Sequence, residues 1–137
     1  MRPEIRYTRN HEIAIAYAVI GTGPDDLLYL SPYNNLDIVW ENPLYERFLR
    51  RLSSSSRLIV IDRRGTGVSD RYSADDLPVM EDLVDDLEAV LDEVGSERAA
   101  LFGSSDAGAL CAMFAATHPE RVSGLILYST RPLPFTR

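Results

Sequence analysis

Residues 101–108 read Leu-Phe-Gly-Ser-Ser-Asp-Ala-Gly, a turn of small residues that follows an apolar run. The run over 99–102 predicts a buried strand, and the small apolar residues over 107–117 predict a helix directly after it. A sharp strand-to-helix turn is the setting of the nucleophile elbow, G-x-S-x-G, which raises a serine hydroxyl above the end of a sheet. We therefore interpret Ser105 as a candidate nucleophile, and the backbone N–H of Asp106 as one donor to an oxyanion.

The match to this motif is imperfect at its second glycine. Ala107 stands at that position, and Gly108 follows one residue later. The alternative interpretation is a helix start built from small residues without any chemistry. These eight residues alone do not separate the two interpretations.

Outward from the elbow, predicted strands and helices alternate along the chain. The expected strands are 5–9, 11–20, 27–30, 57–61, 99–102 and 125–128, and the expected helices are 43–52, 79–94 and 107–117. Wholly apolar strands that alternate with helices indicate a parallel sheet covered on both faces. We expect an α/β fold with a mostly parallel sheet, helices on both faces and an N-terminal antiparallel hairpin.

Two further segments carry a resemblance to a known family. Residues 62–70 read Asp-Arg-Arg-Gly-Thr-Gly-Val-Ser-Asp after a predicted strand, and residues 118–122 read His-Pro-Glu-Arg-Val behind the elbow helix. Together with turn glycines at 21 and 23, they resemble the α/β-hydrolase family, in which a D-x-R-G-x-G-x-S loop follows the fourth strand. The order and spacing of these segments fit along nearly the whole chain.

Segments 57–69 and 91–103 are similar, more narrowly, to the hydrolase-like domains found N-terminal to class III adenylate or guanylate cyclases. Such domains look like serine hydrolases but often have eroded active sites. The resemblance implies either an esterase- or lipase-type serine hydrolase, or a non-catalytic sensing or regulatory module. A truncated product without independent function is a third alternative.

The same resemblance assigns a second oxyanion donor, the backbone N–H of Tyr33. The family has His-Gly-x after its third strand, where this chain has Ser31-Pro32-Tyr33. The proline fixes its own φ and restrains the residue before it, so this loop is expected to differ in shape. Tyr33 and Trp40 are candidates to line an apolar pocket over Ser105, and core packing is the alternative for both.

The chain contains only two histidines, His11 and His118. A general base must lie within hydrogen-bond reach of the nucleophile. His118 follows the elbow helix, so at ~1.5 Å per residue it lies ~15–20 Å from Ser105. His11 falls in the predicted hairpin turn. In the family the acid and the histidine follow the serine, so the resemblance implies a single truncated domain, 1–137, with weak or no turnover by itself.

Composition excludes several other functions. All 14 basic residues are arginine, which excludes a Walker P-loop, a Schiff-base enzyme and a protein kinase, since each needs a lysine. A net charge of -7 argues against nucleic acid as a partner. Cys111 is the only cysteine, which excludes an internal disulfide and a cysteine-based metal site.

The seven carboxylates between 81 and 93 are interpreted as a solvated helix face rather than as metal ligands, and we expect no metal and no cofactor. No apolar run approaches the ~18 residues of a membrane span, and Met1–Glu4 are not followed by the apolar stretch of a signal peptide. A cytoplasmic protein with a small apolar or ester ligand is expected. The apolar last strand, Gly124–Tyr128, predicts self-association or a partner chain through an open sheet edge.

Overall fold

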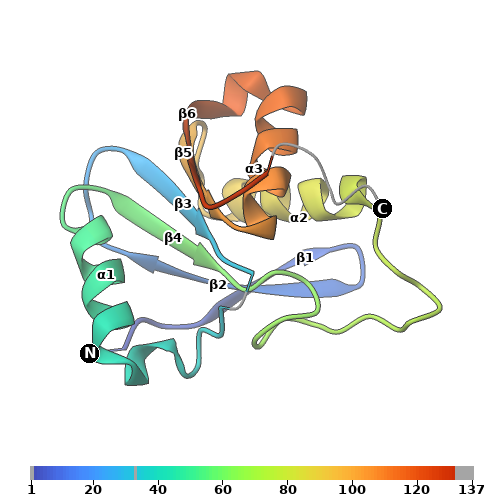
Figure 1. Cartoon of the computed structure of the whole chain (residues 1–137), viewed down its shortest axis with the longest axis horizontal. Coiled ribbons are helices and arrows are strands. Elements are labelled where there is room, and N and C mark those ends of the chain that lie inside the picture. Colours follow the sequence, from blue (N-terminus) through green and yellow to red (C-terminus); the bar gives the residue numbers. More distant parts are fainter. Residues whose placement is uncertain (1, 33, 132–137) are drawn as a thin grey trace.

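The computed structural model describes residues 2–32 and 34–131. Within them, six strands form one sheet with the spatial order β1-β2-β4-β3-β5-β6 (Figure 1). These strands are β1 (Arg6–Asn10), β2 (Ile13–Ile20), β3 (Asp26–Leu30), β4 (Arg57–Ile61), β5 (Ala99–Ser104) and β6 (Val122–Tyr128). β1, β2 and β4 pair antiparallel, and β4, β3, β5 and β6 pair parallel. The predicted parallel sheet with an N-terminal hairpin is confirmed.

Helices cover both faces of this sheet, as the alternation of strands and helices predicted (Figure 1). They are α1 (Pro43–Ser53), α2 (Met80–Glu93) and α3 (Asp106–Thr117), with the short 3₁₀ helices η1 (Val39–Glu41) and η2 (Pro119–Arg121). Alternate strand residues point to opposite faces. Ile59 and Ile61 therefore pack in the core under α2 and α3, whereas Leu58 and Val60 pack with Leu49 of α1.

Local sequence explains where α1 begins and where α2 ends. The Oδ1 atom of Asn42 accepts hydrogen bonds from the backbone N–H groups of Leu44 and Tyr45, at 3.0 and 3.2 Å, and Pro43 is the first helical residue of α1. This is a side-chain N-cap. Gly95, with φ +69°, follows α2 in the left-handed conformation that commonly ends a helix. Both boundaries match the prediction within a residue or two.

The register of the parallel strands brings three loops together at the carboxyl ends of the strands. Leu30 pairs with Ile61 on one side and with Gly103 on the other. The loops after β3, β4 and β5 therefore start at nearly the same level. From β3 the chain continues to β4 on one side of β3, and it later returns to β5 on the other side. The carboxyl ends of these strands therefore form a topological switch point, where α/β folds place their ligands.

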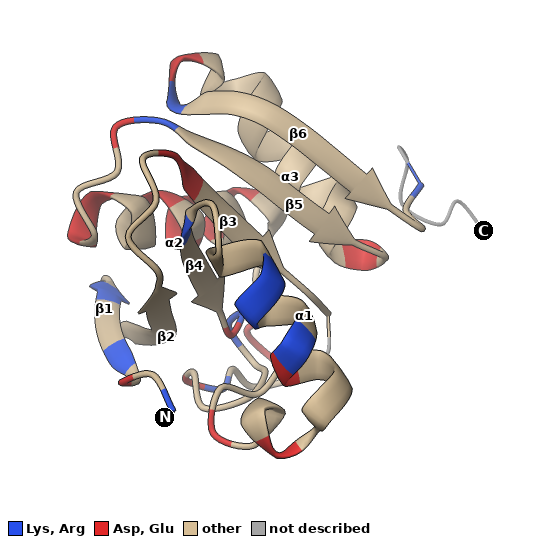
Figure 2. Ribbon diagram, turned by 90° about the vertical axis from the view of Figure 1, so that its left-hand side faces the viewer, with Lys and Arg blue, Asp and Glu red and all other residues tan. Residues whose placement is uncertain are grey.

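β6 is the outermost strand on one side of the described sheet, and β1 is the outermost on the other (Figure 2). It starts at Val122, two residues before the predicted edge segment. Residues 125–128 are between 39% and 67% exposed, although all four are apolar or aromatic. Among the described residues, no helix combines the length and the apolar character needed to cross a membrane.

Candidate active site

Ser105 occupies the turn between β5 and α3 in a strained conformation. Its φ of 52° and ψ of -129° are unusual for a residue with a side chain, and such strain concentrates at functional sites. Its N–H donates to the carbonyl of Tyr128 at 3.0 Å, and its carbonyl accepts from Thr130 Oγ1 at 2.6 Å. The side chain makes no capping hydrogen bond. The backbone of the elbow is therefore fixed, and the hydroxyl is not used to cap the helix.

Two glycines allow this turn to close. A Cβ added at Gly103 would lie 2.7 Å from the Cα of Gly108 and 2.8 Å from the Sγ of Cys111. A Cβ at Gly108 would overlap the side chain of Thr130. Ala107 is fully buried in the core cluster beneath α2 and α3. The turn therefore needs glycine at position 108. Ala107, which replaces the second glycine of the motif, is accommodated because its methyl group packs in the core.

The amino end of α3 is suited to negative charge. Asp106 is the first residue of the helix, so its backbone N–H has no intrahelical acceptor, and the helix dipole favours an anion there. This geometry is compatible with the predicted oxyanion donor. The other predicted donor, Tyr33, lies outside the described residues.

Asp62 links the loops that follow β3 and β4. Its Oδ1 accepts a hydrogen bond from Asn34 Nδ2 at 2.7 Å, and its Oδ2 accepts from the N–H groups of Leu36 and Val68 at 3.0 and 2.9 Å. The carboxyl is fully buried. Burial raises its pKa, and the three donors oppose that rise. The resemblance drew attention to this loop, but only the structure shows that one buried carboxyl holds both loops.

Asp86 corrects the interpretation of the acidic helix face. We expected it to lie on a solvated surface of α2, but it is 4% exposed. Arg64 donates to both of its oxygens, through Nη2 at 2.8 Å and Nε at 2.9 Å, and Asn10 Nδ2 donates at 2.8 Å. A charged carboxylate can be buried when it is paired with an opposite charge and its oxygens are hydrogen-bonded. This pair fastens the loop after β4 to α2.

A hollow of about 300 Å³ lies beside the elbow, lined by Tyr29, Phe48, Phe102, Ser104 and Tyr128. The Tyr29 ring meets the Phe102 and Phe48 rings edge-on, with centroids 5.3 and 5.5 Å apart. Such contacts are the preferred packing of aromatic side chains. The hollow is therefore a largely aromatic surface that begins one residue from Ser105.

Trp40 does not line this hollow. It is 7% exposed, belongs to the core on the α1 side, and donates from Nε1 to the carbonyl of Leu36 at 3.0 Å. Core packing, the alternative open at the sequence level, is thus what the structure shows. Tyr45 lies in the same region, with its hydroxyl 2.8 Å from that of Tyr29. Burial, and then this hydrogen bond, raises the pKa of Tyr45.

Neither histidine is placed to serve Ser105. His118 follows the last residue of α3, at the opposite end of a helix that is ~18 Å long at ~1.5 Å per residue. Its Nε2 lies 2.5 Å from Glu88 Oε2, and its ring stacks on Phe114 with centroids 4.6 Å apart. His11 has a φ of 54° in the turn between β1 and β2. Both positions agree with the sequence argument.

Neither a metal cluster nor a reactive thiol is found in the described part of the chain. No group of three or more His, Cys, Asp or Glu side chains there could hold a metal ion. Cys111 is buried beneath α3, and burial raises the pKa of its thiol to about 12. A thiol at that pKa is almost wholly protonated at neutral pH and is a poor nucleophile.

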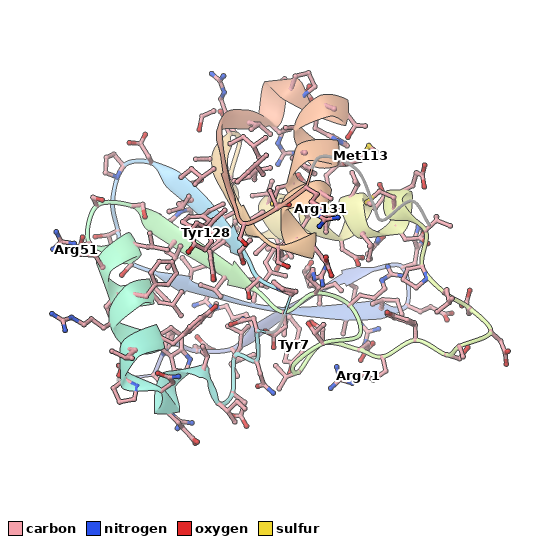
Figure 3. All side chains as sticks on the ribbon, in the orientation of Figure 1. Tyr7, Arg51, Arg71, Met113, Tyr128 and Arg131 are labelled. Carbon is pink, nitrogen blue, oxygen red and sulfur yellow. The ribbon has the colours of Figure 1, made fainter. Side chains whose placement is uncertain are left out.

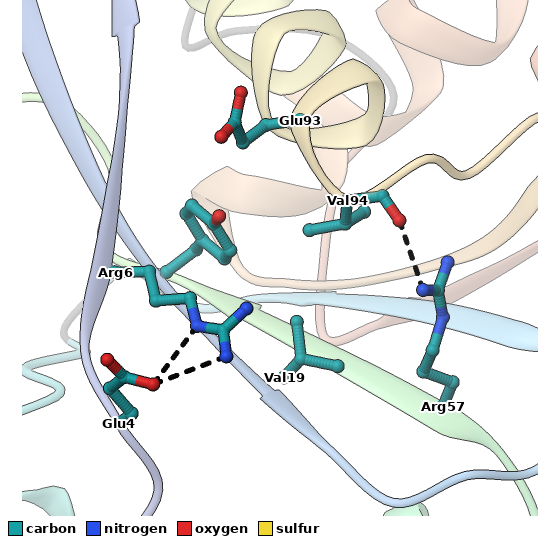
Figure 4. A pocket seen from close by; sticks show the side chains of 7 residues that line it. Glu4, Arg6, Val19, Arg57, Glu93 and Val94 are labelled. Atoms are coloured by element: carbon teal, nitrogen blue, oxygen red, sulfur yellow. Dashed lines mark hydrogen bonds and ion pairs between the residues drawn. The ribbon is translucent and has the colours of Figure 1, made fainter.

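A polar pocket of about 330 Å³ lies between the hairpin and the carboxyl end of α2 (Figure 4). Arg6 in this pocket pairs with Glu4 at 3.2 Å, and Arg57 donates to the carbonyl of Val94 at 3.0 Å. Arg57 begins β4, so the pocket lies at the end of the sheet opposite the elbow. It is not part of the candidate active site.

Comparison with known proteins settles the family. A sequence model described as alpha/beta hydrolase fold matches residues 33–137. The chain belongs to the α/β-hydrolase fold family. It is 34% identical over 127 residues to a putative 2-succinyl-6-hydroxy-2,4-cyclohexadiene-1-carboxylate synthase of Bacillus subtilis, covering 86% of this chain and 42% of that protein. It is 41% identical over 71 residues to a proline iminopeptidase of Neisseria gonorrhoeae, covering 52% of this chain and 23% of that one.

A solved structure agrees with this family assignment. The chain resembles Est816, described as an N-acyl homoserine lactone degrading enzyme, with a TM-score of 0.76 and 29% identity. The match covers 91% of this chain and 45% of Est816. The chain therefore spans less than half the length of each of these three proteins.

Proposed function

We propose that Ser105 is the nucleophile of a serine hydrolase that acts on ester-like bonds. The observation that carries the proposal is the strained elbow, in which the backbone of Ser105 is locked and its hydroxyl is not used as a helix cap. Membership of the α/β-hydrolase family supports it.

In the proposed reaction, the Ser105 oxygen attacks the carbonyl carbon of the ester while a base takes the hydroxyl proton. The backbone N–H groups of Asp106 and Tyr33 hold the oxyanion of the tetrahedral intermediate. The alcohol then leaves with that proton, and an acyl group remains on Ser105. Water hydrolyses the acyl-enzyme by the same steps.

We propose that the base and the acid come from a segment outside these 137 residues or from another chain, because His11 and His118 both lie away from Ser105. By itself the chain is expected to turn substrate over slowly. An oxyanion hole can sustain a residual rate when the triad is incomplete.

The proposed substrate is a small apolar ester, and the aromatic hollow beside the elbow is the surface that would receive its apolar part. The kind of molecule that Est816 is described as degrading contains such a bond, because the lactone ring of an N-acyl homoserine lactone is a cyclic ester. The cytoplasm is the location that we propose, and nucleic acid is not a proposed partner, given the net charge of -7.

The second candidate function is a non-catalytic sensing or regulatory module that binds an apolar ligand in the same hollow. The position of His118 at the opposite end of α3 from Ser105 favours it, since an unactivated serine is a weak nucleophile. The relatives named above give no support to a link with cyclases in particular. What remains is a binding function without turnover.

Labelling with a fluorophosphonate probe tests the nucleophile directly. We expect the probe to attach to Ser105, and p-nitrophenyl esters to be hydrolysed slowly, because the oxyanion donors act without the base. Ser105→Ala should abolish both signals. Ser55→Ala, which removes an exposed hydroxyl beyond α1, should leave both unchanged.

Two outcomes would count against the proposal. Labelling that persists in Ser105→Ala would show that Ser105 is not the nucleophile. An unlabelled wild-type chain that still binds a p-nitrophenyl ester without hydrolysing it would favour the sensing module.

A further inference from the structure

A groove of about 200 Å³ lies on the solvent-exposed side of α2 and α3. Its apolar lining comes from Met80, Val84 and Met113, and its other lining residues are Glu81, Asp85, Thr117 and His118. These residues come from the amino-terminal half of α2 and the carboxyl-terminal half of α3. The groove is therefore separate from Ser105, which lies before the amino end of α3.

Met113 gives this groove an apolar surface that the described residues leave partly exposed. It is 42% exposed and points outward from α3 (Figure 3). Most other residues of that helix are alanine, glycine or fully buried. A flexible, polarizable methionine adapts to partner side chains of different shapes, so exposed methionine is common at binding surfaces.

One side of α2 adds a row of carboxylates. Glu81, Asp85, Glu88 and Asp92 follow a 4-3-4 spacing, which places them along one side of the helix over ~16 Å. α2 contains no basic residue, and acidic segments are visible along it in Figure 2. Glu88 pairs with His118, and Asp92 pairs with Arg121. Among the described ion pairs, none includes Glu81 or Asp85.

The charge pattern identifies the kind of partner. No group of three or more acidic side chains in the described part of the chain is arranged to hold a metal ion, and this row extends over about three helical turns beside an apolar groove. A helix that carries apolar anchors at i and i+4 beside a row of Lys or Arg complements both features at once. We propose that the groove between α2 and α3 binds a basic amphipathic helix of a partner protein.

Binding of a designed peptide tests this surface in the full chain. The probe is a fluorescein-labelled helix of about 18 residues built from Leu, Ala and Lys, with its Leu residues at i, i+4 spacing. We expect saturable binding by fluorescence anisotropy that weakens as salt is raised. Glu81→Gln combined with Asp85→Asn should weaken binding about three- to tenfold. Met113→Gln should weaken it as well, because the apolar anchor loses its contact.

A matched control separates this groove from general attraction to an acidic protein. Asp25→Asn combined with Glu97→Gln removes the same two charges from exposed positions outside the groove, and should leave affinity within about twofold. The proposal is overturned if this control weakens binding as much as the groove variant. It is also overturned if the peptide does not bind, or if an analogue with Gln in place of Lys binds equally well. Circular dichroism confirms that each variant keeps its helices.

Discussion

At the scale of single residues, the elbow depends on a pair of facing glycines. A methyl group at Gly103 would meet the backbone of Gly108 at 2.7 Å, and backbone cannot move aside as a flexible side chain can. We expect Gly103→Ala to lower the free energy of unfolding by about 2 kcal/mol, the cost of forcing atoms into a packed site. The same variant should lose probe labelling, since the turn that holds Ser105 is displaced. Chemical denaturation and labelling measure the two effects.

Gly124→Ala is the control for this substitution. The nearest atom to its added Cβ is the Cβ of Ala100, at 4.0 Å, which is ordinary contact. Its stability should stay within ~0.5 kcal/mol of the wild type. Equal effects from the two variants would show that the elbow has no special need for Gly103.

Residues whose role is set by near neighbours in the chain were predictable. Asn42 beside Pro43 identified the start of α1, because a capping side chain acts on the N–H groups two and three residues later. Asp62 and Asp86 were not predictable in the same way. Their partners lie in segments far apart in the sequence, such as Asn34 and Arg64, and only tertiary packing brings them together.

At the scale of elements, one ion pair joins the amino ends of β3 and β4 to the end of α2. Arg57 donates to both carboxylate oxygens of Asp26, at 2.6 and 2.9 Å, and to the carbonyl of Val94 at 3.0 Å. The side chains are 31% and 14% exposed, so water only partly screens the pair. We expect Asp26→Asn to cost about 1 kcal/mol at neutral pH, less than a fully buried hydrogen bond to a charged group, because water screens part of the interaction.

The pH dependence of this cost follows from the pKa of Asp26. The Arg57 hydrogen bond lowers that pKa below its ordinary value of 3.8 in the folded chain. The ion pair therefore stabilises the fold fully above that value, and this contribution is lost as pH falls through the folded pKa. Urea denaturation should show the wild type and Asp26→Asn converging in strong acid. Asp25→Asn, at the exposed neighbouring position, is the matched control variant for this comparison.

The sequence predicted only part of strand β6. Apolar character marked only its carboxyl half, because Ser123 and Gly124 do not favour a strand by themselves. Pairing with β5 nevertheless extends the strand back to Val122, through a register shift between Ala99 and Ala100. A neighbouring strand thus imposed structure that local propensity did not indicate.

At the scale of the whole molecule, the sequence predicted the fold, and with it which loops lie near one another. The elbow and the loop after β4 each follow a buried parallel strand, so the shared direction of the strands brings both to the carboxyl-end side of the sheet. The lining of the hollow was not predictable. Tyr29, Phe48 and Phe102 come from three elements, and their convergence depends on how α1 packs against the sheet.

β6 forms a lateral edge of the described sheet, and this edge is exposed. An unpaired strand with apolar side chains is a template for pairing with another chain, and a lysine on such a strand opposes it. Ile126 of β6 is 47% exposed. We expect the wild-type chain to self-associate through β6 as its concentration rises in light scattering, and Ile126→Lys to remain monomeric. Leu44→Lys, at a 77% exposed position on α1, should associate like the wild type. A wild-type chain that stays monomeric would contradict self-association through β6, and equal disruption by both lysines would place the contact elsewhere.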